Sequence, residues 1–240
     1  MQTLSPIIIT GASQRIGLAV ALSLFQQGLP VVISYRTQRP LISELQDMGI
    51  ICIRADFSSE NGVTEFIEEI KKRYDSLRAV IHNASEWFAE SDTCSPEVLM
   101  ERMWHLHVMA PYRINLAFES LLYAGSKHDR PSDIIHITDF VAEKGSDKHL
   151  AYASSKAGLA NLTLSFAKRC APRVKVNSIA PSLLMFHDSD TMEYRKKALS
   201  KSLLAVEPGE REGVEAVQYL LNSRYITGRT LSLDGGRHLA

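Results

Sequence analysis

The stretch TGASQRIG, residues 10–17, decides the fold. The apolar run PIIIT at 6–10 leads directly into it and is predicted to form a strand, and the amphipathic segment 16–27 behind it is predicted to form a helix. Gly11 allows a tight turn between the two, and the free N–H groups at a helix start attract a pyrophosphate. A plain strand-to-helix turn is the alternative. The stretch favours a nucleotide-binding loop.

The rest of the chain repeats this alternation of strand and helix. Short β-branched apolar runs predict strands at 6–10, 30–35, 50–56, 78–84, 133–138, 174–180 and 229–235. Segments of helical period predict helices at 16–27, 40–48, 61–74, 96–124, 150–170 and 211–222. Strands that are apolar throughout are covered on both faces, so we expect an α/β fold: a Rossmann-type, doubly wound, parallel seven-stranded sheet with helices on both faces. Its binding crevice is expected at the carboxyl ends of the strands.

Composition points to one domain, residues 1–240, with a small-molecule site. The 27 basic residues balance the 27 acidic ones, which gives no support to a nucleic-acid partner or a membrane partner. Cys52, Cys94 and Cys170 lie far apart without CxxC spacing, so neither a disulfide framework nor a metal site is expected. The start of the chain lacks the charge pattern of a signal peptide, and we expect a cytoplasmic protein.

The end of the second strand indicates the cofactor. An acid about 20 residues beyond the loop holds the ribose 2′-OH of NAD, whereas an arginine accommodates the 2′-phosphate of NADP. Here Arg36 and Thr37 stand at that distance, and the next acid is Glu44. The sequence therefore predicts NADPH as the cofactor, with Arg15 and Arg36 on the phosphate side of the adenosine.

The motifs together resemble those of the short-chain dehydrogenase/reductase family. They are TGxxxxxG, ADFS, HNAS, YASSK, VNSIAPS and ITGRTLSLDGG, and the resemblance extends from Ile7 to Leu239. The family's loop has a glycine where this chain has Arg15, and that exchange is similar to the loop of the pteridine reductases. The resemblance implies cofactor binding by Gly11, Ser13, Arg15, Ile16, Gly17, Arg36, Thr37, Asp56, Asn83, Ala84, Tyr152, Lys156 and Pro181. For Asp56 a helix cap is the alternative.

Tyr152 and Lys156 carry the predicted chemistry. They stand at i and i+4 of a predicted helix and so share a face. A nearby ammonium favours the phenolate, so we expect a lowered pKa for Tyr152 and a hydroxyl that acts as acid or base near neutral pH.

Asp139 stands thirteen residues before Tyr152, where the family has a catalytic serine. Pteridine reductases resemble this chain in carrying aspartate there, which implies a proton relay to a ring nitrogen. A turn cap at the strand end is the alternative interpretation. The family's catalytic asparagine aligns with His107, whose role the sequence leaves open; His105 lies two residues away and off its helix face, which disfavours a metal site.

The substrate side begins on the loop after the fourth strand. In pteridine reductases an aromatic at the place of Trp87 stacks the pterin against the nicotinamide; a hydrophobic cover is the alternative. Residues 183–208 are expected to cover the substrate. The predicted substrate-binding residues are Arg15, Ser85, Trp87, Asp139 and Tyr152.

The resemblance implies NADPH-dependent hydride transfer to C6 of a dihydropterin, with weaker action on dihydrofolate, in a homotetramer. One alternative is a general carbonyl or 3-oxoacyl reductase, which Asp139 disfavours because a carbonyl site prefers a neutral hydroxyl donor. The other is a non-catalytic NADP-sensing protein, which the intact Tyr152 and Lys156 disfavour.

Overall fold

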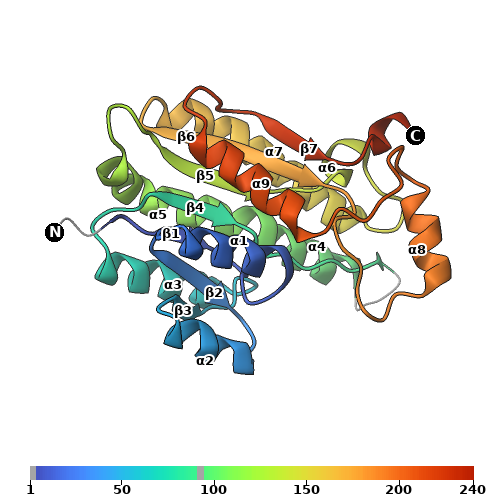
Figure 1. The fold of residues 1–240 in the computed structure, drawn as a ribbon, viewed down its shortest axis with the longest axis horizontal. Helices are drawn as coiled ribbons and strands as arrows, with labels where there is room; N and C mark the ends of the chain where they lie inside the picture. Colours follow the sequence, from blue (N-terminus) through green and yellow to red (C-terminus); the bar gives the residue numbers. More distant parts are fainter. Residues whose placement is uncertain (1–3, 91–94) are drawn as a thin grey trace.

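A computed structural model describes residues 4–90 and 95–240 of the chain. Cys94 lies outside them, and Cys52 and Cys170 are free. Seven parallel strands form one sheet in the order β3-β2-β1-β4-β5-β6-β7 (Figure 1). They are β1 (Ile7–Ile9), β2 (Val31–Tyr35), β3 (Ile51–Arg54), β4 (Ala79–His82), β5 (Ser132–Ile137), β6 (Val174–Pro181) and β7 (Thr230–Leu233). Each lies within or beside its predicted run, and the predicted fold class is confirmed.

The helices follow the predicted segments with four differences. They are α1 (Arg15–Gln26), α2 (Pro40–Asp47), α3 (Glu60–Arg73), α4 (Pro96–Trp104), α5 (Ala110–Gly125), α6 (Val141–Lys144), α7 (Leu150–Cys170), α8 (Met192–Leu199) and α9 (Glu210–Asn222). The helix predicted over 96–124 is divided into α4 and α5 by a π-helical turn, η2 (His105–Met109). The short helices α6 and α8 were not predicted, nor was the 3₁₀ turn η3 (Arg237–Leu239).

The sheet separates two hydrophobic cores. Successive strand residues point to opposite faces, so Ile8 packs with α3, α5 and α7, whereas Ile7 and Ile9 pack with α1, α2 and α9. These helix layers lie on opposite sides of the sheet in Figure 1. Burying one such isoleucine contributes about 1.5–3 kcal/mol, which explains why both faces of each strand are apolar.

Connections leave β1 in one direction along the sheet and β4 in the other, which opens a crevice at the carboxyl ends of these two strands. At the opposite end of the sheet Asp133 is fully buried between two cations. It accepts hydrogen bonds from Arg78 at 2.5 Å and from Lys175 at 2.6 Å. The same cations donate to the carbonyls of Leu221 and Leu220 and fasten the end of α9.

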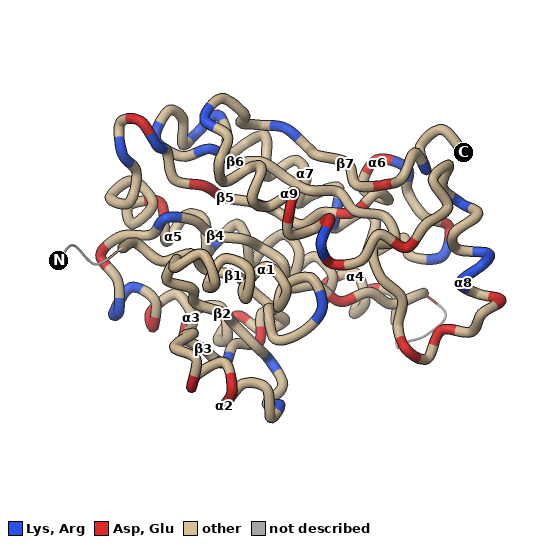
Figure 2. Tube along the Cα trace, viewed as in Figure 1, with Lys and Arg blue, Asp and Glu red and all other residues tan. Residues whose placement is uncertain are grey.

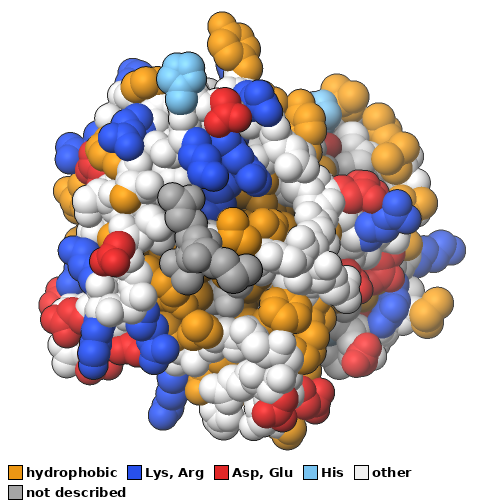
Figure 3. Space-filling model, turned by 60° about the vertical axis from the view of Figure 1, so that its left-hand side comes forward, with side chains coloured by type: hydrophobic (Ala, Val, Ile, Leu, Met, Phe, Trp, Pro, Cys, Tyr) orange, Lys and Arg blue, Asp and Glu red, His pale blue; other side chains and the backbone are white. Residues whose placement is uncertain are grey.

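The surface carries both signs of charge. Basic and acidic residues are spread along the whole trace in Figure 2, and they alternate with hydrophobic side chains over the face on the N-terminal side in Figure 3. Within the described residues, the helices are too short or too polar to span a bilayer.

Candidate active site

The loop at residues 10–17, which is predicted to bind the cofactor phosphates and is called the phosphate loop below, is fastened to the end of β4. The side-chain amide of Asn83 donates to the carbonyls of Thr10 at 3.0 Å and Gly11 at 2.9 Å. The Thr10 hydroxyl accepts the backbone N–H groups of Asn83 and Ala84 in return, both at 3.0 Å. The direct contacts of Asn83 and Ala84 are thus with the loop.

This close seating explains both glycines. Gly11 has a φ of +62°, and a Cβ there would stand 2.7 Å from the Cα of Ala84. A Cβ on Gly17 would stand 2.4 Å from the side-chain nitrogen of Asn83. A larger residue at Gly11 must shift the backbone at Ala84, and one at Gly17 must displace the Asn83 amide that fastens the loop.

The start of α1 suits a bound phosphate. Gln14 stands at the N-cap and, within the described residues, makes no side-chain hydrogen bond to the first turn, which also lacks an acidic residue. The positive end of the helix dipole is therefore not neutralised by the chain itself. Ser13 is half-buried beside this turn, and Ile16 packs against Gly213 of α9. The residues fit a dinucleotide phosphate.

Arg15 has a left-handed backbone conformation, which favours the glycine that the family has at this position. Its φ is +53°, a value that costs a side-chain-bearing residue about 1–2 kcal/mol. The guanidinium donates to the carbonyl of Met185 at 2.9 Å and lies 3.1 Å from Nδ1 of His187. Arg15 therefore links the phosphate loop to the covering segment, residues 183–208.

The covering segment is held at both ends. Gly209 donates its N–H to the carbonyl of Leu184 at 2.8 Å, and Phe186 donates its N–H to Glu207 at 2.7 Å. Leu184 and Phe186 are buried, whereas α8 between these ends is largely exposed.

Asp56, just beyond β3, accepts hydrogen bonds from the N–H and hydroxyl of Ser58 at 3.0 and 2.7 Å. Partial burial raises the pKa of Asp56, but these bonds and the charges of Arg36 and Arg102 bring it below the ordinary value. The N-cap of α3 is Ser59, so the helix-cap interpretation of Asp56 is wrong.

Arg36 and Thr37 lie exposed just beyond β2. Arg36 forms an ion pair with Glu86, whose other oxygen accepts hydrogen bonds from Arg102 at 2.7 and 2.9 Å. Sequence reasoning missed Glu86 and Arg102, which are sixteen residues apart and belong to no motif.

Tyr152 and Asp139 meet as predicted. The Tyr152 hydroxyl donates to one oxygen of Asp139 at 2.8 Å, and the other oxygen accepts the N–H of Val141 at 2.9 Å. Asp139 is thus both a turn cap and a partner of the tyrosine. Lys156 donates to the carbonyl of Ile137 at 2.8 Å, with its nitrogen 5.6 Å from the centre of the Tyr152 ring.

The predicted lowering of the Tyr152 pKa is wrong for the protein without ligand. Burial and then the carboxylate of Asp139 raise the pKa of Tyr152 well above its ordinary value. The hydroxyl touches the carboxylate, whereas the ammonium acts from a greater distance. Burial lowers the pKa of Lys156 to about 8, against the opposing effect of Asp139. Tyr152 is a neutral phenol at physiological pH.

His107 orients Ser85 through a fixed tautomer. The Ser155 hydroxyl donates its only proton to the carbonyl of Tyr152 at 2.7 Å, so it accepts the Nδ1–H of His107 at 2.8 Å. Nε2 of His107 then accepts the hydroxyl proton of Ser85 at 2.9 Å. Burial holds the pKa of His107 well below its ordinary value, so the ring stays neutral.

Other histidines of the interior are satisfied structurally. His82 bonds to Asn115 at 2.7 Å and His136 to Thr163 at 2.8 Å. No group of three or more metal-ligating side chains occurs among the described residues.

Trp87 is 59% exposed, so it does not cover a core. Its ring meets that of His149 edge-on at 4.8 Å between centroids. On the other side, Pro181 at the end of β6 is buried and accepts the N–H of Phe140 at 2.9 Å. Pro181 thereby supports the loop that carries Asp139.

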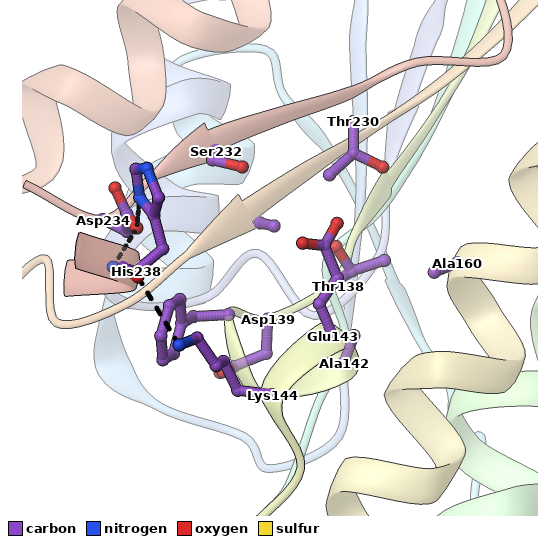
Figure 4. A pocket seen from close by; sticks show the side chains of 12 residues that line it. Thr138, Asp139, Ala142, Glu143, Lys144, Ala160, Thr230, Ser232, Asp234 and His238 are labelled. Atoms are coloured by element: carbon purple, nitrogen blue, oxygen red, sulfur yellow. Dashed lines mark hydrogen bonds and ion pairs between the residues drawn. The ribbon is translucent and has the colours of Figure 1, made fainter. Parts of the chain in front are cut away.

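A cavity of about 340 Å³ borders Asp139 from the side of α6 and the C-terminal turn. Figure 4 shows Asp234 and His238 paired at one end of it, at 2.7 Å, with Lys144 beside them. Glu143 lines the same cavity.

Comparison with known proteins gives the family. Residues 5–196 match the family model of the short chain dehydrogenases. The chain belongs to the short-chain dehydrogenase family. It is 53% identical to the dihydromonapterin reductase of Klebsiella pneumoniae subsp. pneumoniae, over 98% of this chain and 97% of that one. It is 51% identical to the dihydromonapterin reductase of Citrobacter koseri, with the same coverage.

A solved structure agrees with this fold. The FolM alternative dihydrofolate reductase 1 of Brucella canis, in complex with NADP, has a TM-score of 0.85 and 27% identity. The match covers 98% of this chain and 94% of that one.

Proposed function

We propose that this chain reduces 7,8-dihydromonapterin to the tetrahydro form with NADPH, with weaker activity on dihydrofolate. The observation that carries the proposal is the pair of Tyr152 and Asp139, a carboxylate where a carbonyl reductase presents a neutral hydroxyl. The choice of pterin rests on likeness to the dihydromonapterin reductases, and the cofactor on Arg36 and the NADP of the FolM structure.

NADPH, when bound, supplies the hydride that C6 of the dihydropterin receives. N5 takes the accompanying proton, so the C=N double bond becomes a C–N single bond with one new hydrogen on each atom. In our proposal Asp139 carries this proton. Tyr152 stays protonated and holds the carboxyl in position across the 2.8 Å bond. Asp139 takes up one proton from solvent water before each turnover, passes it to N5 and returns to the carboxylate form.

The proposal gives the remaining predicted residues roles beside this pair. Lys156 holds the ribose next to the nicotinamide, and Ser85, oriented by His107, faces the substrate with its oxygen lone pairs. Trp87 supplies a stacking face, worth about 0.5–1.5 kcal/mol for a flat ring. Arg15 reaches from the cofactor phosphate to the pterin edge; an Arg15→Gly variant is expected to lose pterin affinity, and full pterin turnover by it would refute this role.

The test is NADPH oxidation at 340 nm with dihydromonapterin, dihydrobiopterin and dihydrofolate side by side. Asp139→Asn keeps the size and the acceptor for Val141 but cannot carry a proton, so kcat should fall about 10²–10⁴-fold. Glu143→Gln removes the same charge one turn away, and we expect it to keep normal activity. A fall of less than tenfold for Asp139→Asn contradicts the relay. Turnover of ketones but of no pterin would make the chain a general carbonyl reductase.

We also propose that the chain acts as a homotetramer in the cytoplasm. Large apolar side chains lie exposed along α4, η2, α5 and α7: Met100, Trp104, Met109, Tyr112, Leu116 and Leu164. Exposed large apolar side chains on neighbouring helices are typical of a subunit interface. Light scattering gives the mass directly, and Leu116→Glu with Leu164→Glu should yield smaller species; a monomeric wild type would refute the assembly.

A further inference from the structure

Glu86 joins three separate elements at the adenosine end of the crevice. It lies on the loop after β4 and forms an ion pair with Arg36, just beyond β2. Its second oxygen accepts both Nε and Nη2 of Arg102 on α4, at 2.9 and 2.7 Å. One carboxylate is thus held between two guanidinium groups, one from the end of β2 and one from α4.

The three side chains Arg36, Glu86 and Arg102, called the bridge below, differ in their exposure to solvent. The Glu86 side chain is 13% exposed, whereas those of Arg36 and Arg102 are 50% and 42% exposed. The anion is enclosed, and both cations keep an open side toward solvent. A ligand that brings a larger anion can therefore approach the arginines without first displacing other parts of the chain.

Surrounding groups fix the two arginines in place. The guanidinium of Arg102 lies 5.0 Å from the centre of the Phe88 ring, and Arg54 at the end of β3 donates to the carbonyl of Arg36 at 3.4 Å. Asp56 lies near enough for both Arg36 and Arg102 to act on its charge. Both guanidiniums therefore border the residue expected beside the adenine.

We propose that Arg36 and Arg102 together bind the 2′-phosphate of NADPH, and that Glu86 occupies their binding site as an internal anion until the phosphate displaces it. The proposal rests on the proposed use of NADPH. Arg36 follows from its position after β2; Arg102 and Glu86 are additions that only the three-dimensional arrangement reveals. A carboxylate and a phosphate monoester suit the same planar arginine donors, and the phosphate adds a third oxygen and a second charge.

Because only a phosphate can displace Glu86 from the two arginines, Glu86 affects the binding of NADPH but not that of NADH. NADH carries a 2′-hydroxyl, which cannot compete with the carboxylate for two guanidiniums, so the bridge stays closed to it. The phosphate of NADPH replaces the bridge, and its net affinity is reduced by the cost of breaking it. Removing the charge of Glu86 should thus tighten binding of the phosphorylated ligand and leave binding of the unphosphorylated ligand unchanged.

The experiment measures binding without turnover, using the full chain, isothermal titration calorimetry and two probes. The first probe, 2′,5′-ADP, carries the phosphate, and the second, 5′-AMP, lacks it. We expect Arg102→Met to lower the affinity for 2′,5′-ADP about tenfold or more, and Arg102→Lys to restore part of that loss. Glu86→Gln should raise the affinity for 2′,5′-ADP severalfold. All three variants should bind 5′-AMP as the wild type does.

Two control variants make the same charge changes at exposed positions, and neither should change the affinity for 2′,5′-ADP. They are Glu101→Gln, where Glu101 is exposed on α4, and Arg211→Met, where the Arg211 side chain on α9 is 84% exposed. Unchanged 2′,5′-ADP affinity in both Arg102 variants would overturn the role of Arg102. Weaker 2′,5′-ADP binding by Glu86→Gln would show that Glu86 positions the arginines and would overturn the displacement. Because no pterin is present, failure of the proposed reaction leaves these outcomes unaffected.

Discussion

Lys156→Met should make the protein more stable and inactive at once. Lys156 is fully buried, and its pKa falls from 10.5 to about 8. At about 1.4 kcal/mol per unit, that shift means that keeping the ammonium charged inside the protein costs about 3 kcal/mol. The variant also loses the bond to the carbonyl of Ile137, worth about 1 kcal/mol, so a net gain of about 2 kcal/mol is expected.

The sign of the pH dependence follows from linkage. Between pH 8 and 10.5 the unfolded chain holds a proton on Lys156 that the folded chain has released. Wild-type stability relative to the variant therefore rises with pH through this window, and the advantage of Lys156→Met is largest at pH 7 and declines toward pH 10.

Urea denaturation of the two proteins at pH 7.0 and pH 9.5 measures both effects. Lys168→Met makes the same exchange at an exposed position of α7 and should change the free energy of unfolding by less than about 0.5 kcal/mol. A Lys156→Met protein that is less stable than the wild type at pH 7, with an unchanged denaturant slope, would refute the reasoning and show that the ammonium stabilises the empty fold.

Two further substitutions test the framework of the site. Gly17→Ala brings a Cβ to 2.4 Å from the Asn83 amide, so the loop should detach from β4 and 2′,5′-ADP affinity should fall at least tenfold in calorimetry; an unchanged affinity would mean that the loop has room to adjust. Asp133→Asn leaves Arg78 and Lys175 buried without a counter-charge and should cost about 3–5 kcal/mol by urea denaturation, with the pterin KM unchanged in the folded protein; a cost below 1 kcal/mol would contradict the structural role given to this cluster.

The strands were predictable because each is a short apolar run between polar turns. Ile7, Ile8 and Ile9 show why. Because a core lies on each face of the sheet, every position of the strand is apolar, and the strand can be recognised without knowing which residues point to which face. The division of α4 from α5 was not predictable, since apolar residues continue through His105–Met109 and one wider turn leaves no mark in the sequence. Neither was α6, which has only four residues.

Some of the charged contacts of the site could likewise be predicted from the sequence, and others could not. Tyr152 and Asp139 were paired from motif spacing, but the shift of the tyrosine pKa was predicted with the wrong sign. Helical spacing reveals which cation shares a face with the hydroxyl, whereas the bond to Asp139 depends on where β5 ends relative to α7. Glu86, on the loop after β4, and Arg102, on α4, meet only in the folded chain, so their contact leaves no pattern along the sequence.

This chain differs from the family at two site positions, and the two differences are best understood together. Arg15 replaces the glycine of the loop, and Asp139 replaces the catalytic serine. Arg15 holds a left-handed backbone that a glycine would adopt without strain, so the chain accepts a cost of about 1–2 kcal/mol to keep a guanidinium there. Its side chain reaches Met185 and His187, and Asp139 accepts the Tyr152 hydroxyl. A site that contains both a fixed cation and a carboxylate suits a planar substrate that accepts a proton at one ring edge and presents acceptors at another. A simple ketone has one oxygen to offer and would use only one of them.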